Sequence, residues 1–424
     1  MTDPGASATA TAAPRSFAAL RHRGARHYLL GAMLAMMADN VEHVISYWIL
    51  YQKFRSPALG GFAVLSHWLP FLLFSVYAGA LADRFDPRRL IQLAMVLFMA
   101  VSVGWGVLAW SGTLEVWHAA VLLTLHGLAG VLWGPAGQML VHDIVGRAEL
   151  QSAIRMMATS RTLGVLLGPA LGGALLVLCG PSLGILINVA IYLPLTLWLW
   201  KAPYGPRFRQ QAAETGTRAL RGIDEIRATL REVAGNRTIL TMMLLAGGAS
   251  LLVGNAYQAQ MPQFADDLGH GEGGLHYSVL LAATAAGAVI AGLVLESRSL
   301  LQAHPRTALI LAIAWCFAIA GFAVTDVYPL AVALLFVAGF LDLSYNSMAQ
   351  TLVQLNAPVA IRGRIIGVYN MVGLGLRAFS GVTVGFGGSL IGIHWSLALS
   401  AMVLLVAVAT LLSLALRPAP AAGE

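Results

Sequence analysis

The sequence predicts an all-α polytopic membrane protein, with twelve transmembrane helices arranged as two pseudo-symmetric six-helix bundles. Hydrophobic residues make up 58% of the 424 residues and charged residues only 11%, whereas soluble domains are about 25% charged. The apolar residues occur in blocks of about 20, the length that a helix needs to cross a bilayer. They do not alternate with a period of two, which argues against the strands of a membrane barrel.

The apolar blocks place each span along the chain. The expected spans are 28–50, 59–82, 89–110, 117–141, 153–178, 181–200, 238–262, 275–296, 306–325, 328–355, 363–390 and 394–416. The first segment, "MTDPGASATATAAPRS", lacks an apolar core, so it is expected to be a disordered tail and not a cleaved signal peptide. The expected domains are a tail (1–27), an N-terminal bundle (28–200), a connector (201–237), a C-terminal bundle (238–416) and a second tail (417–424).

Basic residues predict the orientation of these spans. With the N-terminus in the cytoplasm, 22 of the 26 Lys and Arg residues face the cytoplasm, and only Lys53 and Arg55 face outward. Arg161 and Arg377 lie inside spans. This bias predicts a cell-membrane protein of the inner or plasma membrane with both termini in the cytoplasm. Basic loops beside anionic lipid also account for the net charge of +7, so no nucleic-acid partner is expected.

The two halves resemble each other and are joined by one long connector. "GLAGVLWGPAGQMLV" (127–141) aligns with "GFLDLSYNSMAQTLV" (339–353) at a constant offset of 212 residues, although chance similarity of apolar helices is the alternative. Tandem six-helix repeats imply a pseudo-two-fold axis along the membrane normal and a path between the bundles near the midplane. Within the connector, "TRALRGIDEIRATLREVAGN" predicts an amphipathic helix on the membrane surface.

Ionisable residues within the first expected span are costly inside a bilayer and therefore indicate function. Asp39, Glu42, His43 and Ser46 are spaced i, i+3, i+4 and i+7, so they share one helix face. This face is expected to point into the bundle or a hydrated cavity. There, a desolvated carboxylate can exchange a proton as access alternates, which makes Asp39 and Glu42 the expected proton carriers.

Other spans carry polar residues at midplane depth. Arg377 falls near the centre of its span and needs a carboxylate partner, for which Asp342 and Glu42 are the candidates. We expect it to attract an anionic or polar group of the substrate, although a purely structural salt-bridge network is an open alternative. His67 and His126 are expected to be interhelical hydrogen-bonding residues. The expected path residues are Asp39, Glu42, His43, Asn255, Gln258, Asp342, Asn346 and Arg377.

Two motifs stand at defined places between and within spans. "GALADRFDPRRL" follows the second span and contains Gly79, Asp83, Arg84, Arg88 and Arg89. "GVLLGPALGG" lies in the fifth span and contains Gly164, Gly168, Pro169, Gly172 and Gly173.

Glycines four residues apart in the second motif share one face and allow a neighbouring backbone to approach, while its proline bends the helix. The small-residue stretch "AATAAGAVIAG" (282–292) is the expected partner surface. Asp83 of the first motif is expected to be held by nearby cations and helix N-termini, which would lock the cytoplasmic side until the bundles rock. The arginines of that motif can also be read as mere topology markers.

These motifs resemble those of the major facilitator superfamily, the first its cytoplasmic loop motif and the second the motif of its antiporters. "WGPAGQMLVHDIVGRAEL" and "IRGRIIGVYNMVGLGLRAFSG" are most similar to the branch of proton-driven exporters that includes macrolide and enterobactin exporters. The resemblance covers nearly the whole chain. It implies the major facilitator fold and secondary active, proton-coupled export of a small amphipathic molecule, such as a drug, secondary metabolite or siderophore.

Residue patterns for other chemistries are lacking or fall in unsuitable places. Lys53 and Lys201 are the only lysines, so no phosphate-binding loop exists and no direct use of ATP is expected. "GPSLG" (180–184) fits a nucleophile motif but joins two expected spans, so it is expected to be a turn. Cys179 and Cys316 offer neither a disulfide framework nor a metal-site spacing. The chain is therefore not expected to be an enzyme or to bind a cofactor.

Two alternatives to this function stay open. Asp39 and His43 are similar to the first-helix ligand pair of ferroportins, and an Asp/His pair at i, i+4 can hold a transition metal. This suggests a ferroportin-like exporter of a metal or a metal chelate. The second alternative is a membrane receptor or scaffold that transports nothing. In the preferred interpretation the partners are a small-molecule substrate, protons and the lipid bilayer, and the protein is monomeric.

Overall fold

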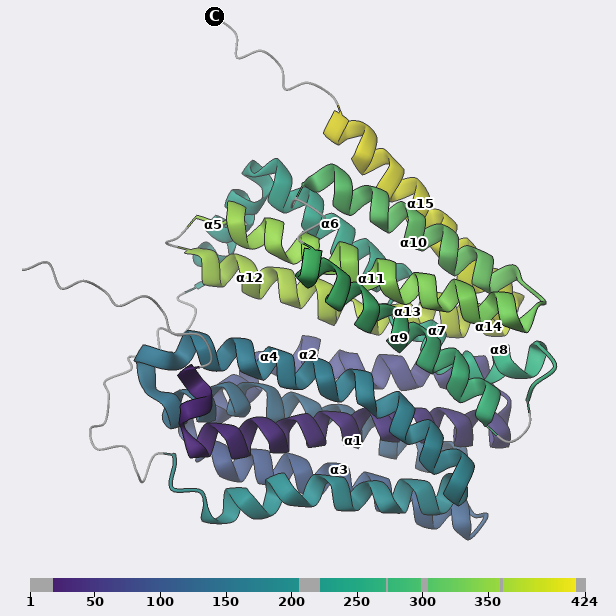
Figure 1. Ribbon diagram of the computed structural model, residues 1–424, viewed down its shortest axis with the longest axis horizontal. Helices are drawn as coiled ribbons and strands as arrows, with labels where there is room; N and C mark the ends of the chain where they lie inside the picture. The colour runs from purple at the N-terminus through teal and green to yellow at the C-terminus, as the bar shows by residue number, and fades with distance from the viewer. Residues whose placement is uncertain (1–17, 206–221, 272–273, 299–303, 359–360, 417–424) are drawn as a thin grey trace, which may run out of the picture.

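The computed structural model describes residues 18–205, 222–271, 274–298, 304–358 and 361–416. Every regular element within these ranges is helical, and the long helices run along a common direction (Figure 1). In the N-terminal half these are a short 3-10 helix (Ala18–Arg21), α1 (Arg23–Phe54), α2 (Pro57–Arg84), α3 (Pro87–Trp110), α4 (Val116–Lys201) and α5 (Gly222–Gly235).

The C-terminal half contains more and shorter helices. They are α6 (Arg237–Leu252), α7 (Ala256–Ala259), α8 (Met261–Asp267), α9 (Leu275–Arg298), α10 (Pro305–Val324), α11 (Tyr328–Asn356), α12 (Arg362–Asn370), α13 (Arg377–Ser380), α14 (Gly387–Ile391) and α15 (Ile393–Leu416). Two π-helical turns, Met371–Gly375 and Gly381–Phe386, flank α13. Together α12, α13 and α14 form one interrupted span.

The predicted all-α polytopic fold is confirmed, and this is a multi-pass membrane protein. Ten helical segments of the described chain are long and apolar enough to cross a membrane. One of them, Ser152–Lys201, has 50 residues and therefore suffices for two crossings. α1 is long enough to add another, because its 32 residues extend for about 48 Å at 1.5 Å per residue. The described helices thus provide twelve crossings, at the positions that the apolar blocks predict.

Two glycines divide the long helix α4 into three crossings. Gly146 has φ 68° and ψ −177°, and Gly180 has φ 73° and ψ 170°, a backbone region that is essentially restricted to glycine. Each therefore allows a sharp turn where a side chain would be strained. The turn at Gly180 is the one predicted for "GPSLG".

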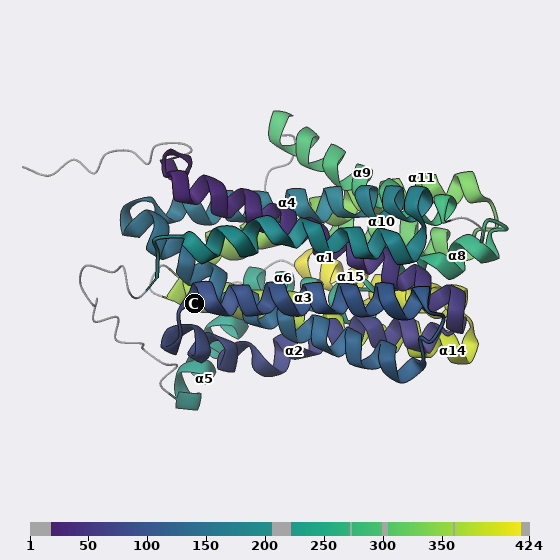
Figure 2. The same cartoon turned by 90° about the horizontal axis from the view of Figure 1, so that it is seen from below.

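The helices group into two bundles that lie side by side. α1 to α4 form the N-terminal bundle, coloured from purple through blue to teal in Figure 1, and α6 to α15 form the C-terminal bundle, coloured from teal-green to yellow. In Figure 2 the N-terminal bundle faces the viewer. The predicted boundaries of these bundles and of the connector stay predictions, and the tails and residues 206–221 lie largely or wholly outside the described residues.

α5 lies at the end of the molecule where α1 begins, which we call the near end (Figure 1). The amphipathic helix predicted in the connector is found here, although its first residues lie outside the described chain. Val233 is buried, whereas Leu230 is 48% exposed. One apolar residue of the predicted face therefore packs against the protein and another does not.

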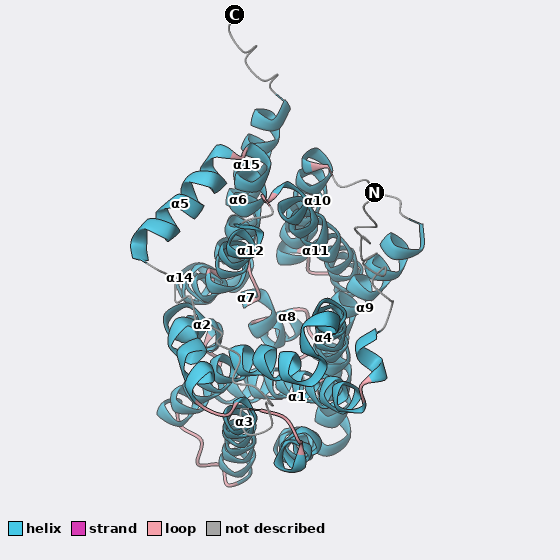
Figure 3. Cartoon of the chain, turned by 90° about the vertical axis from the view of Figure 1, so that its left-hand side faces the viewer, coloured by secondary structure: helices cyan, strands magenta, loops and turns pink. Residues whose placement is uncertain are grey.

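The two bundles contact each other closely at the opposite end, which we call the far end. A methyl group added to Gly61 of α2 would lie 2.3 Å from the carbonyl oxygen of Gly381, so two backbones touch there. The side-chain amide nitrogen of Gln260 donates a hydrogen bond to the backbone carbonyl oxygen of Pro57 at 2.7 Å. Figure 3 shows the molecule along its helices from the near end, and in this view α7 and α8 lie in the middle, between the helices of the two bundles.

Charged and polar side chains add to the contact at the far end. Asp266 of α8 accepts hydrogen bonds from the Tyr51 hydroxyl at 2.5 Å and from Arg55, which follows α1. The Tyr277 hydroxyl of α9 donates to the carbonyl oxygen of Val44 at 3.0 Å. The far end is therefore closed by contacts of α1 and α2 with the helices of the C-terminal bundle.

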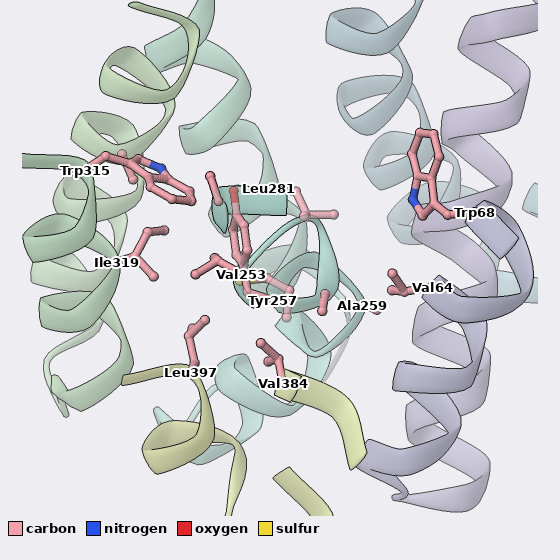
Figure 4. Close-up of a cluster of buried hydrophobic side chains, with 14 of the residues drawn as sticks. Val64, Trp68, Val253, Tyr257, Ala259, Leu281, Trp315, Ile319, Val384 and Leu397 are labelled. Atoms are coloured by element: carbon pink, nitrogen blue, oxygen red, sulfur yellow. The ribbon is translucent and has the colours of Figure 1, made fainter. Parts of the chain in front are cut away.

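Buried hydrophobic side chains line both sides of the boundary between the bundles (Figure 4). Trp315, Ile319 and Leu397 gather within the C-terminal bundle, and Trp68 and Val64 project from α2 on the other side. This packing positions the polar residues described next.

Candidate functional site

Two adjoining cavities lie between the bundles and share several lining residues, so we describe them together as the central cavity. Their volumes are about 350 Å³ and about 250 Å³. Both bundles contribute to both of them. The shared lining residues are Asn40, His43, Tyr47, Arg161, Val165, Asn255, Gln258 and Arg377.

The central cavity brings together most of the polar residues singled out in the sequence. Seven of the eight path residues line it, namely Asp39, His43, Asn255, Gln258, Asp342, Asn346 and Arg377. Glu42 does not line it, and its predicted part in proton coupling stays a prediction. Glu42 is only 2% exposed and lies inside the N-terminal bundle. A helix turns by about 100° per residue, so Glu42 and His43 lie at opposite edges of the polar face of α1.

Glu42 belongs to a buried cluster of charged and polar side chains. It accepts a hydrogen bond from the Ser102 hydroxyl of α3 at 2.5 Å. One of its oxygens lies 2.7 Å from Nδ1 of His126, on α4. Nε2 of the same ring lies 2.9 Å from a carboxylate oxygen of Asp39. His126 therefore lies between the buried carboxylate and the one at the cavity wall. Its Nδ1 is within hydrogen-bond distance of Glu42, whereas its Nε2 approaches Asp39 without hydrogen-bond geometry.

His126 and His67 are site residues whose arrangement the sequence did not predict. The rings of His43, His67 and His126 lie close together, with centroid separations of 4.8, 4.8 and 5.3 Å. They come from three different helices, so no spacing in the sequence links them. Their joint presence in apolar spans was the only available signal.

A break in the seventh span places two amides at the cavity. α6 ends at Leu252 and α7 begins at Ala256, and Gly254 between them has φ 47°. Asn255 and Gln258 follow this break directly and line the cavity. Interrupted helices expose backbone groups at the binding sites of many transporters.

Two arginines face the same cavity from opposite bundles. Arg377 stands over the Trp68 ring with its guanidinium carbon 5.4 Å from the ring centroid, and its Nε has no hydrogen-bond partner among the described residues. Among the same residues no ion pair joins Arg377 to Asp342 or Glu42, the partners expected for it. Asp342 instead accepts a hydrogen bond from Asn346 at 3.0 Å, although it lines the cavity with Arg377.

Arg161 is the second cavity arginine, and the sequence analysis noted only its place within a span. It lines both parts of the cavity. A single charge inside an apolar span was the signal that could have identified it. The π-helical turns on either side of Arg377 are likewise of a kind frequently found at functional sites.

The loop motif between α2 and α3 anchors its own bundle. Arg88 forms an ion pair with Asp86 at 2.6 Å and donates to the carbonyl of Ala202 at 2.5 Å. Burial acts to raise the pKa of Asp86, but the hydrogen bonds from Arg88 outweigh it and hold that pKa below its usual value. Arg89 donates to Gln92 at 2.8 Å.

The other residues of the loop motif make fewer contacts. Arg84 is exposed at the end of α2, and a side chain added at Gly79 would meet nothing within 4 Å. The Asp83 side chain lies outside the described residues. The predicted role of Asp83 as a lock stays a prediction.

The glycine motif packs mainly against α1 and not against the expected partner segment 282–292. An added methyl group would lie 2.6 Å from Met33 O at Gly164, 2.4 Å from Asn40 Cβ at Gly168 and 3.0 Å from Val44 Cβ at Gly172. Among the motif glycines, only Gly173 has α9 atoms as the nearest neighbours of an added methyl group. An added methyl group at Gly173 would lie 2.6 Å from Cβ of Ser278 on α9, and Pro169 lines the cavity.

Two helical bundles around a central polar cavity define a membrane transporter of the major facilitator superfamily, and such a protein is not an enzyme. A family model described as "transmembrane secretion effector" matches residues 14–423. The chain belongs to this family of transporters.

A curated relative matches over a limited region. MdtD of Salmonella typhi, a protein named for multidrug resistance, is 33% identical over 137 residues, which are 32% of this chain and 28% of the relative. The match thus spans less than a third of the relative's length.

Solved structures match over nearly the whole chain. A bacterial homologue of the human lysosomal transporter Spinster, inward-facing and unoccupied, aligns with a TM-score of 0.70 and 16% identity over 92% of this chain and 96% of that one. The nucleoside transporter NupG aligns with a TM-score of 0.71 and 14% identity over 93% and 100%. A D-xylose-proton symporter aligns with a TM-score of 0.60 and 18% identity over 91% and 95%. At these identities the likeness shows the fold.

Proposed function

We propose that this transporter exports a small amphipathic organic molecule, such as a drug, secondary metabolite or siderophore, in exchange for protons and by alternating access. The observation that carries the proposal is the central cavity, to which both bundles contribute. Its larger part, about 350 Å³, is within the range of small-molecule sites. It combines apolar and aromatic walls with two guanidinium groups and two carboxylates, so an amphipathic molecule with a polar or anionic group would fit.

The proposed orientation assigns the two ends of the molecule to the two sides of the membrane. The excess of basic residues puts both termini, and therefore the near end, in the cytoplasm of a cell or inner membrane. The contacts of Asp266 then close the outward side, and the conformation described is inward-facing. The Salmonella relative, which matches about a third of this chain, is named for multidrug resistance, and this name supports export. We propose that a monomer is sufficient, because each chain contains a complete cavity.

Proton coupling is proposed at the cluster around His126. Asp39 lines the cavity, Glu42 is buried, and His126 lies within 2.9 Å of both carboxylates, so a proton taken up at the cavity can be shared with the interior. Arg377 would attract the polar group of the substrate. The loop motif at Asp83, Arg84, Arg88 and Arg89 with Gly79 would gate the near end, and the glycine motif of the fifth span would guide movement against α1.

Transport in inverted membrane vesicles tests this proposal. With an imposed pH gradient, acid inside, wild-type vesicles are expected to accumulate a lipophilic cationic dye or another amphipathic substrate, and an ionophore that collapses the gradient should abolish accumulation. Asp39→Asn is expected to remove the dependence on the gradient. Asp326→Asn, at an exposed position outside the cavity, is the control. Gradient-independent accumulation by the wild type would contradict proton coupling.

A further inference from the structure

We propose that His43, His67 and His126 form a binding site for a divalent transition-metal ion on the wall of the central cavity. The candidate ligand nitrogens of these three side chains all lie within 4.8 Å of one another. The rings come from α1, α2 and α4, and His43 and His67 line the cavity. The sequence suggested a metal only at Asp39 and His43, and the fold adds two imidazoles to that pair.

The first argument is the orientation of two of the rings. Nδ1 of His43 lies 2.8 Å from the carbonyl oxygen of Asp39, and Nδ1 of His126 lies 2.7 Å from the Glu42 carboxylate. A carbonyl oxygen can only accept, so Nδ1 of His43 carries the proton and Nε2 of the neutral ring has a free lone pair. Histidines that bind metals are commonly held in this way, with the second nitrogen donating to a carbonyl or carboxylate.

The second argument is that the cluster contains unsatisfied nitrogen atoms. Nδ1 of His67 and Nε2 of His126 are buried without a hydrogen bond among the described residues. The latter lies 2.9 Å from Asp39 Oδ1, but without hydrogen-bond geometry. Buried polar atoms normally have partners, and an exception needs an explanation such as a bound ion.

The third argument is the number and type of ligands. Three imidazoles make a set that suits Zn²⁺, Ni²⁺ or a similar ion. Asp39, whose Oδ1 lies 2.9 Å from Nε2 of His126, stands next to this set as a candidate fourth ligand. Tetrahedral binding with bonds of about 2.1 Å puts the ligand atoms about 3.4 Å apart. Because the candidate atoms lie within 4.8 Å of one another, the side chains must draw together by up to about 1.4 Å.

The surrounding charges indicate how the ion would be bound. Arg161 and Arg377 line the same cavity as His43 and would repel a bare dication. They would favour an ion that retains an anionic ligand on the cavity side. The ion is therefore proposed as a substrate, alone or in an anionic complex. Its transport rests on the proposed function, but its binding does not.

Binding to the purified full-length protein, made without a histidine tag, tests the site. Co²⁺ alone serves as the spectroscopic probe and Zn²⁺ alone as the calorimetric one. The wild type is expected to bind one ion. His43→Ala, His67→Ala and His126→Ala should each weaken binding by about tenfold or more, and Glu42→Gln should weaken it by about 10- to 100-fold through His126. Adding citrate, an anionic ligand, distinguishes binding of the ion alone from binding of an anionic complex. Only the anionic complex should bind more weakly to the Arg161→Gln variant than to the wild type.

The matched control is the double variant His270→Ala/His276→Ala. These two rings stack 4.1 Å apart near the far end and lie outside the central cavity. Their loss should leave binding unchanged. Thermal unfolding of each variant checks its fold, and His67→Gln, closer in size, replaces any His67→Ala protein that fails to fold.

Two results would overturn the metal site: affinity unchanged in all three single histidine variants, or binding lost only in the control. Dye transport without metal binding would reject the metal site and leave the proposed function intact. Metal binding without gradient-driven transport would reject the proposed function and leave the metal site intact.

Discussion

Glu42 and Glu149 each lie 2.7 Å from a histidine nitrogen, yet their surroundings differ completely. The Glu42 side chain is 2% exposed and that of its partner His126 is 5% exposed. The Glu149 and His22 side chains are 31% and 39% exposed. Breaking a buried charge pair leaves the remaining charge without compensation, whereas an exposed pair exchanges its contact for water.

This comparison predicts very different costs for the same substitution. Glu42→Gln is expected to lower the free energy of unfolding by about 3 kcal/mol. Glu149→Gln is expected to lower it by less than about 1 kcal/mol. Unfolding in mixed micelles, followed by circular dichroism, measures both. Equal effects of the two substitutions would mean that the Glu42 cluster does not stabilise the N-terminal bundle.

Individual site residues were predictable only where their own span made them unusual. Asp39, His43 and Arg377 could be identified because a charge or imidazole in an apolar block is costly. The direction in which the Glu42 side chain points could not be predicted, because residues spread over about 100° of one helix face can face either the bundle interior or the cavity. The contact between Glu42 and His126 depends on how α1 packs against α4, which neither span encodes alone.

Among the elements, the crossing of α1 and the fifth span is the closest contact that the glycine motif forms. At Gly168 an added Cβ would lie 2.4 Å from Asn40 Cβ and 2.9 Å from Met37 O. Cβ and backbone atoms of a packed helix cannot rotate away, so the helices must separate. At Gly134 of the same α4 helix, nothing lies within 4 Å of an added Cβ.

Alanine substitutions at these two glycines should therefore have opposite effects. Gly168→Ala is expected to destabilise the protein by about 1–3 kcal/mol, the usual cost of overpacking. Gly134→Ala should be neutral or stabilise it by up to about 1 kcal/mol, because alanine favours a helix over glycine. Melting temperatures of the purified proteins compare them. A similar loss at both positions would indicate that helix propensity, and not the crossing, controls stability there.

Element boundaries were predicted within a few residues because the thickness of the bilayer fixes the length of each apolar block. The interruptions within the spans were not predicted. Gly254 and the π-helical turns around Arg377 leave the average hydropathy of their spans unchanged, so an apolar block conceals them. The partner of the glycine motif was also mispredicted, because a small-residue face shows that a close approach occurs but not which helix makes it.

For the whole molecule, the twelve spans and the internal repeat predicted two bundles, but not which end they close. Closure depends on contacts between residues more than 200 positions apart, such as Tyr51 with Asp266. Asp266 and Asp267 are adjacent in sequence but bind different bundles. Asp266 contacts Tyr51 and Arg55 of the N-terminal bundle, and Asp267 contacts His394 of its own bundle at 3.1 Å. Burial acts to lower the pKa of Arg55, but its hydrogen bonds with Tyr51 and Asp266 outweigh this effect and hold that pKa above its usual value.

Substitution of these two aspartates should therefore separate closure from stability. Asp266→Asn removes a charge that faces the other bundle, so it is expected to shift the population toward opening at the far end by about fivefold, or about 1 kcal/mol. Asp267→Asn should leave the population unchanged, since its partner moves with it. Pulsed electron paramagnetic resonance measures the separation of the bundles. The spin labels are attached to cysteines introduced at Thr113 and Val327, both exposed near the far end, and Cys179 and Cys316 are replaced by alanine. The distance distribution should gain a longer component in Asp266→Asn alone. If Asp267→Asn produces the same component, or Asp266→Asn produces none, the contacts of Asp266 do not hold the far end closed.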